Sequence, residues 1–153
     1  MKKLIYLLMA LPLLFVSCDD DDDLPKVKIG IETSGCKIVD GTIYVVQGDT
    51  LGIDSISITP IDPKNKVALA SVNYFWDRMY VETTNIPPFA FAITTGNLMT
   101  GRHLLQMRGS VLAVNYAPAI AYIDYTVMVV ESAEDIPSGK VETAMIVTPD
   151  IDD

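Results

Sequence analysis

The sequence predicts an all-β domain behind a short apolar segment and an acidic run. From Val27 onward, most segments alternate apolar and polar residues with a period of two, as strands with one buried face do. Turn residues recur roughly every ten positions, and no segment after residue 23 repeats apolar residues at helical spacing. Together these patterns predict a two-sheet antiparallel sandwich of about seven strands.

The first seventeen residues have the layout of a secretory signal peptide. Lys2 and Lys3 precede an apolar run from Leu4 to Ser17 that only Pro12 interrupts. This run is shorter than the roughly 20 residues that a membrane-spanning helix needs. We therefore predict that residues 1–17 are removed and that Cys18 begins the mature chain.

The apolar run ending in Ser17 and Cys18 resembles the lipobox of bacterial lipoproteins. The resemblance implies cleavage between these two residues and a diacylglyceryl group on the Cys18 sulfur. Phe15 departs from the Leu, Val or Ile that is usual at its position. A non-lipidated signal peptide with a chance cysteine is the alternative. Apart from this covalent lipid, which would anchor the protein to a membrane, no cofactor is expected.

Residues 18–25 are predicted to form a flexible acidic spacer. They contain five consecutive aspartates: Asp19, Asp20, Asp21, Asp22 and Asp23. This run resembles the export signal of surface lipoproteins in the Bacteroidota, which implies an outer-membrane location facing the cell exterior. Two alternatives stay open: an inward-facing outer-membrane lipoprotein, and a solvated spacer kept extended by charge repulsion.

The formal net charge of −9 is confined to the two ends of the chain. Between Leu24 and Val130, eight acidic residues balance eight basic ones. No basic stripe is present to replace phosphate counterions, so nucleic acid is not an expected partner. Because Cys18 would carry lipid, Cys36 would stand alone and the domain would contain no internal disulfide.

The first half of the domain is predicted to contain a strand, a hairpin and a kinked strand. Alternation predicts a strand over residues 27–32. Asp40-Gly41 separates predicted strands at 36–39 and 42–47, and Asp-Gly is a strong signal for a tight hairpin turn. Beyond residue 50 the apolar face changes sides near Asp54-Ser55, which predicts a bulge or a break into two short strands.

The second half is predicted to contain strands at residues 70–76, 80–84, 89–94, 102–113 and 121–129. The strand at 80–84 is short and suits a sheet edge. Residues 131–153 form an acidic tail in which Val141–Thr148 is apolar enough for one more strand. That strand either pairs with a sheet edge or stays mobile.

The strand order, with Trp76 in the middle strand and Thr100-Gly101-Arg102-His103-Leu104-Leu105 opening a later one, resembles bacterial immunoglobulin-like domains of the PKD-like kind. The resemblance implies an immunoglobulin-like sandwich over residues 26–130. The cysteine pair that joins the two sheets of antibody domains is missing, and no clear tyrosine corner is present.

The residues do not predict an enzyme. His103 is the single histidine, and it lies on the apolar side of its strand, which suits a core or turn residue. No Gly-x-Ser-x-Gly motif is present for nucleophilic catalysis. One histidine and one cysteine do not supply a zinc site, so no metal is expected. Glu32 and Glu82, the two glutamates of the domain, lie in or near short strands and do not suit a glycosidase pair.

A binding face is the candidate site. If the strands that contain Trp76, His103 and Tyr125 are neighbours, as the resemblance implies, seven outward residues gather on one face: Asn73, Phe75, Leu104, Gln106, Arg108, Tyr122 and Asp124. Apolar side chains among polar ones on a solvent-facing side indicate contact with a glycan or a surface protein. Alternatively, the tail strand or Val81 covers them, or they are ordinary scattered surface residues.

The sequence therefore predicts a lipid-anchored, surface-facing, non-catalytic binding or accessory module. The alternative is a structural or pilus-like subunit whose Val141–Thr148 strand completes the sheet of a neighbour.

Overall fold

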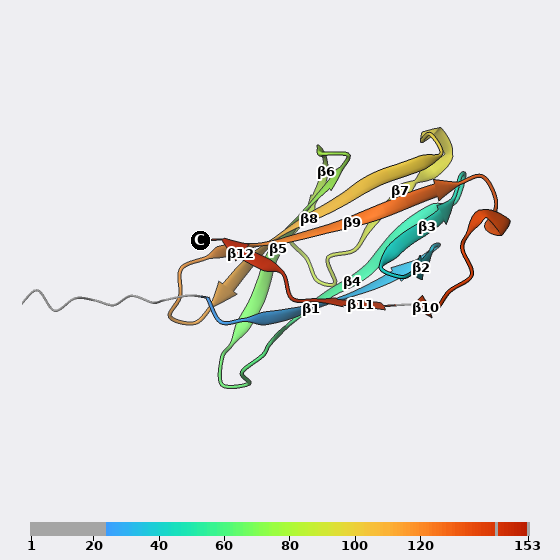
Figure 1. The fold of residues 1–153 in the computed structure, drawn as a ribbon. Helices are drawn as coiled ribbons and strands as arrows, with labels where there is room; N and C mark the ends of the chain where they lie inside the picture. The colour runs from blue at the N-terminus through green and yellow to red at the C-terminus, as the bar shows by residue number, and fades with distance from the viewer. Residues whose placement is uncertain (1–23, 143, 153) are drawn as a thin grey trace, which may run out of the picture.

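The computed structural model describes residues 24–142 and 144–152, which form two packed β-sheets (Figure 1). The smaller sheet has the order β11-β1-β4-β7, and the larger has the order β10-β2-β3-β9-β8-β5-β6, with β12 also paired to β9. The smaller sheet consists of β1 (Val27–Ser34), β4 (Thr50–Pro60), β7 (Phe91–Thr94) and β11 (Ala144–Val147). The larger consists of β2 (Lys37–Val39), β3 (Thr42–Val46), β5 (Val67–Trp76), β6 (Met79–Thr84), β8 (Gly101–Ala113), β9 (Ala119–Val130), β10 (Val141–Glu142) and β12 (Asp150–Asp152). Two 3-10 turns complete the described chain: η2 (Thr95–Asn97) and η3 (Ala133–Asp135).

The predicted all-β immunoglobulin-like sandwich is confirmed. Strands β1, β4 and β7 share one sheet while β5, β8 and β9 share the other, which matches the A-B-E and C-F-G division of immunoglobulin domains. Two details differ from the prediction of about seven antiparallel strands. The pair β3–β9 is parallel, and the tail contributes three further short strands.

The hairpin and the bulge predicted in the first half are both present. Asp40 and Gly41 have φ angles of 48° and 77°, and they connect β2 to β3 as a two-residue turn with both φ values positive. In the β1–β4 pair, Glu32 lies opposite Ser55 and Thr33 lies opposite Ile53, so Asp54 is the extra residue of a bulge. The bulge is the reason why the apolar face changes sides along β4.

A second bulge corrects the predicted start of the Trp76 strand. Leu69 pairs with Val111 and Ser71 pairs with Ser110, so Ala70 is left over and is exposed. The period-two alternation of the sequence predicts that Ala70 faces the same side as Val72. In the structure Val72 is buried, while Val67 and Leu69 pack against the core from the other side of the bulge.

Aromatic residues join the two sheets across the core. The rings of Tyr74 on β5 and Phe91 on β7 are stacked, with centroids 4.4 Å apart. The Tyr74 hydroxyl is buried and donates a hydrogen bond to the Phe89 carbonyl oxygen. These contacts hold the segment before β7 against the inner side of the larger sheet. The outward-facing residues of β5 lie on the opposite side of that sheet.

The acidic tail returns to the sandwich instead of staying mobile. Strand β10 pairs with β2, β11 pairs with β1, and β12 pairs with β9, so the tail crosses between the two sheets (Figure 1). Met145 on β11 is 5% exposed and belongs to the core. In this structure the segments that strand addition would place in a neighbour's sheet, Val141–Glu142 and Ala144–Val147, are paired within their own chain.

Candidate functional site

The structure brings the seven residues of the candidate binding face onto one side of the larger sheet. Strands β5, β8 and β9 lie side by side in the order that the site requires (Figure 1). Two rows of partners cross these strands. The first row is Asn73–Arg108–Tyr122, and the second is Phe75–Gln106–Asp124, with Leu104 beyond it on β8. We call these seven residues the outer face; each is exposed or half-buried, whereas their inward neighbours on the same strands are buried.

Arg108 organises the centre of the outer face. Its Nη1 atom donates a hydrogen bond to Oδ1 of Asp124 at 2.6 Å, and Gln106 Nε2 donates to Oδ2 of the same carboxylate at 3.1 Å. The Arg108 guanidinium also lies 4.8 Å from the centroid of the Tyr122 ring, a cation–π contact. One face of the Tyr122 ring is therefore occupied by Arg108 already.

Asp124 is held in its ionised form. Partial burial would raise the pKa of this carboxyl group, but hydrogen bonds from Arg108 and Gln106, together with the charge of Arg108, lower it below its usual value. The centre of the outer face is therefore a fixed ion pair with polar groups at its rim, an arrangement suited to orienting a polar ligand.

Strand β6 adds an aromatic residue that sequence reasoning did not assign to the site. Tyr80 is 61% exposed, and its ring lies edge-on to Phe75 with centroids 5.9 Å apart. Its hydroxyl donates to Thr83 Oγ1 at 3.0 Å, and Thr83 donates in turn to Asn73 Oδ1. An edge strand at 80–84 is predicted from the sequence, but the link to the outer face requires the β5–β6 register.

That register follows from a tight turn with an unusual sequence. Asp77 and Arg78 connect β5 to β6 with φ angles of 50° and 69°. A two-residue turn with both φ values positive is normally indicated by Asn-Gly or Asp-Gly. With arginine at the second position the usual signal is missing, so the hairpin is not evident from the sequence.

Neither proposed cover buries the outer face, whose seven residues are exposed or half-buried. Val81 is 43% exposed and lies at the irregularity in the β5–β6 pairing. Strand β12 pairs with the edge of β9, with Asp150 opposite Tyr122. Tyr122 remains 38% exposed. The tail therefore extends the sheet beside Tyr122.

His103 is a structural residue at the end of the outer face. Its Nδ1 lies 2.7 Å from Asp77 Oδ2, and its Nε2 lies 2.8 Å from the carbonyl oxygen of Met99. The centroids of the His103 and Trp76 rings are 5.2 Å apart. Asp77 also accepts a hydrogen bond from the Leu104 amide. Both ring nitrogens are engaged, so the ring is held between the β5–β6 turn and the segment before β8.

A shallow hollow of about 380 Å³ borders the outer face at this end. It is lined by Asp77, Arg78, Arg102, His103 and Leu104. Leu104 belongs both to this hollow and to the outer face. The two features are therefore continuous, and the hollow places two arginines beside the aromatic and polar groups.

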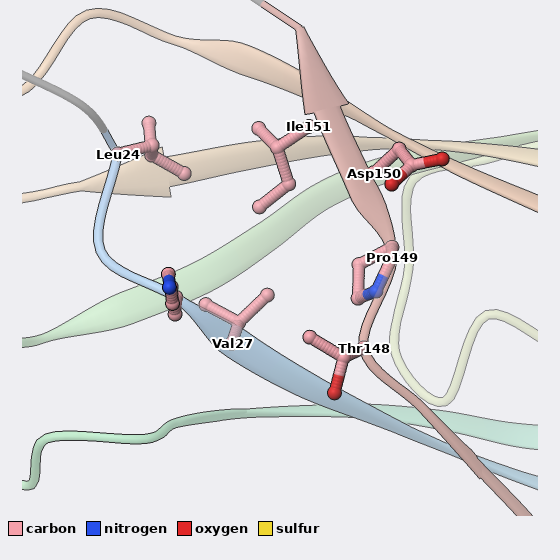
Figure 2. A pocket seen from close by; sticks show the side chains of 7 residues that line it. Leu24, Val27, Thr148, Pro149, Asp150 and Ile151 are labelled. Atoms are coloured by element: carbon pink, nitrogen blue, oxygen red, sulfur yellow. The ribbon is translucent and has the colours of Figure 1, made fainter.

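The lipidation and export residues, Cys18 and Asp19 to Asp23, lie outside the described residues. The described chain begins at Leu24, beside the C-terminal tail. Figure 2 shows Leu24 and Val27 facing Pro149 and Ile151 around a pocket of about 300 Å³ at the entry of the chain into the sandwich.

Two further findings concern residues 24–142 and 144–152 only. Within these ranges, His, Cys, Asp and Glu side chains form no group of three that could hold a metal ion. No helix in the same ranges has the length and apolar character needed to cross a membrane.

Comparisons with known proteins show a likeness among solved structures alone. No protein-family model matches the chain. No curated protein matches it. Among solved structures, the fibronectin(III)-like modules of CbhA from Clostridium thermocellum are similar, with 13% sequence identity and a TM-score of 0.39. The match covers 62% of this chain and 93% of that one.

Proposed function

We propose that this protein is a lipid-anchored, non-catalytic binding module that acts by contact through the outer face of its larger sheet. Its anchor is the acylated thiol of Cys18, and Asp19 to Asp23 direct it to the outer leaflet of the outer membrane. Its ligand is a glycan or a protein at the cell surface. The clustering of Phe75, Gln106, Arg108, Tyr122 and Asp124 on one solvent-facing side is the observation that carries this proposal.

The chemistry of the outer face suits a glycan. Aromatic rings lie at its two sides, Phe75 with Tyr80 at one and Tyr122 at the other. Sugar rings can stack on Phe75 and Tyr80 and on the face of Tyr122 that is turned away from Arg108. Gln106 lies between these rings on β8, and Asp124 lies beside Tyr122 on β9; they supply amide and carboxylate groups for sugar hydroxyls. Because Arg108 and Asp124 already neutralise each other, the face selects for stacking and hydrogen bonding more than for net charge.

The proposal is tested by binding to a panel of polysaccharides of different composition. We expect the Phe75→Ala/Tyr122→Ala variant to lose at least tenfold in affinity, which corresponds to about 1.4 kcal/mol and is a modest effect for two aromatic anchors. Tyr44→Ala is the matched control. Tyr44 is a half-buried residue of β3, next to Met128 and outside the outer face.

Binding that is equally strong in both variants would overturn the role of the outer face. If a surface protein is captured in place of a polysaccharide, the same pair of variants decides whether the outer face holds it. Circular dichroism of each variant establishes that the sandwich is intact.

The anchor is tested separately. We expect Cys18→Ala to move the protein from the membrane fraction to the soluble fraction, with loss of the acyl mass from the N-terminal peptide. Protease digestion of intact cells should remove the wild-type domain if it faces outward. Survival of the domain would place it on the periplasmic side.

A further inference from the structure

Exposed apolar side chains gather at the end of the sandwich where the chain enters at Leu24. They are Ile61 at 49% exposure, Leu112 at 44%, Val114 at 59% and Ile120 at 42%. We call these four residues the tether-end patch. Eight other large apolar residues of the described chain are also exposed, but these four share the end from which the proposed anchor leaves, where they can contact something less polar than water.

Hydrogen bonds and strand register place the four residues at this one end. The Ile61 amide donates to the Lys26 carbonyl oxygen at 2.9 Å, directly where the chain enters. The Val114 amide donates to the Lys66 carbonyl oxygen at 3.2 Å. Leu112 and Ile120 lie at the paired ends of β8 and β9, around the turn that contains Val114. Figure 1 shows this turn and the loop after β4 at the end where β1 begins.

The entry of the chain is fixed at this end. Leu24 and Ile151 are both partly buried against the core, and they lie on opposite sides of the pocket at the chain entry (Figure 2). Cys18 precedes Leu24 by six residues. Six residues span at most about 20 Å when fully extended, so a lipid on Cys18 keeps this end within that distance of the bilayer.

We infer that the tether-end patch docks on the lipid surface of the same membrane that holds the acyl chains. The inference rests on the proposed lipid anchor at Cys18. The four apolar side chains enter the boundary between headgroups and acyl chains, where interfacial protein segments bury their apolar faces. The docked domain stands with its strands rising from the membrane, and Phe75, which pairs with Gln106, lies further along the larger sheet than Leu112 and Ile120.

The contact is apolar and not electrostatic. Three exposed lysines, Lys26, Lys64 and Lys66, lie at this end together with the exposed carboxylates of Asp62 and Asp150. These charges nearly balance, and the five aspartates at 19–23 add negative charge beside the same membrane, so anionic headgroups do not attract this end. The lysine stems extend the apolar contact while their ammonium groups stay in water. Docking should therefore not weaken when the salt concentration is raised.

The test uses the full lipidated protein in phosphatidylethanolamine–phosphatidylglycerol vesicles. In a Cys36→Ser background, an environment-sensitive fluorophore is placed at Ala117→Cys, in the turn beside the patch, or at Thr100→Cys, before β8 at the opposite end. Both positions are exposed. We expect spin-labelled lipid to quench the label at position 117 at least threefold more than the label at position 100, with no loss of this difference between 0.05 and 0.5 M salt.

A quadruple variant, Ile61→Ser/Leu112→Ser/Val114→Ser/Ile120→Ser, should abolish this difference while the protein still floats with the vesicles. Its matched control is Met79→Ser/Ile86→Ser/Met99→Ser, which removes three exposed apolar residues away from the tether end and should leave the quenching unchanged.

Three outcomes would overturn the inference. The first is equal quenching at the two positions in floating protein. The second is protection at position 117 that rises with protein density and not with lipid, which would assign the patch to a second copy of the chain. The third is quenching abolished by high salt. Failure of the wild-type chain to float would instead refute the anchor at Cys18, so the two failures are distinguishable.

Discussion

At the scale of single residues, the His103–Asp77 pair gives the domain a pH dependence. Burial would lower the pKa of His103, but hydrogen bonds to Asp77 and to the Met99 carbonyl oxygen, with the charge of Asp77, raise it above its ordinary value. Burial would raise the pKa of Asp77, but hydrogen bonds from His103 and the Leu104 amide lower it. Each group therefore stabilises the fold most when it is charged.

We predict that the folded domain loses stability as the pH rises from 6 to 8. A histidine whose pKa is raised by folding contributes fully below its unfolded value of about 6.5, and the contribution disappears as the pH rises through the folded pKa. Asp77 contributes above its unfolded pKa and loses its contribution as the pH falls through the lower folded value. Thermal unfolding at a series of pH values measures the effect.

The control is His103→Asn, whose stability should change less over the same range. The chain contains one histidine, so its NMR titration is unambiguous. We expect a pKa above 6.5 in the wild type and a lower one in Asp77→Asn. A wild-type pKa at or below 6.5 would contradict the assignment of this ion pair.

Two glycines allow the cost of backbone strain to be distinguished from the cost of a steric clash. Gly35 and Gly41 both have positive φ angles, of 66° and 77°. A Cβ on Gly35 would lie 1.9 Å from the Thr50 carbonyl oxygen, whereas a Cβ on Gly41 would have no atom within 4 Å. We predict a loss of about 1 kcal/mol for Gly41→Ala and of more than about 2 kcal/mol for Gly35→Ala.

Urea denaturation of both alanine variants checks this difference. Equal losses would mean that the backbone carbonyl of Thr50 moves aside at little cost. The chain crosses from β1 in the smaller sheet to β2 in the larger one at Gly35. We therefore attribute the requirement for glycine to that crossing.

At the scale of elements, the strand β11 shows how the tail is held. Met145 is 5% exposed and points into the core, whereas the adjacent Ile146 is 74% exposed on the other side of the same strand. We predict that Met145→Ala lowers the free energy of unfolding by about 2 to 3 kcal/mol. Ile146→Ala, the matched control, should change it by no more than about 0.5 kcal/mol.

Denaturant titration of the two variants measures this difference. If Met145→Ala lowers the free energy of unfolding no more than Ile146→Ala does, then β11 does not stay paired with the edge of β1 in solution. In that case Val141–Thr148 would be free to pair with another chain, as strand addition requires.

The hairpin elements show where sequence reasoning succeeds and where it stops. Asp and Gly readily adopt the positive φ angles that the turn between β2 and β3 needs, so the hairpin at Asp40-Gly41 is predictable. Asp77-Arg78 adopts the same conformation because its surroundings hold it there: Asp77 exchanges hydrogen bonds with Leu104 and binds His103. Tyr80 therefore reaches the outer face through contacts that are distant in sequence.

At the scale of the whole molecule, the tail makes the two sheets one unit. Strands β10 and β12 extend the larger sheet, and β11 extends the smaller one. We predict that residues 24–152 unfold in one cooperative transition. Trp76, the one tryptophan of the chain, is 7% exposed in the core between the sheets, so its fluorescence reports on their packing.

Fluorescence of Trp76 and far-ultraviolet circular dichroism should give the same urea midpoint. A variant that ends at Lys140 should lose stability and expose the edge of β1. An earlier dichroism transition in the intact chain, without a change in fluorescence, would show that the tail unfolds independently.

The sequence by itself determined the class of this fold, the hairpin at Asp40-Gly41 and the side of each strand to which Phe75, Gln106 and Tyr122 belong. These features follow from period-two alternation and turn chemistry, which are local properties. The tertiary structure alone decided that Ala70 lies on a bulge, that Tyr80 joins the outer face, that Arg108 lies over one face of the Tyr122 ring, and that the tail pairs within its own chain. Such contacts join residues far apart in sequence, and their register depends on the packing of the two sheets as a whole.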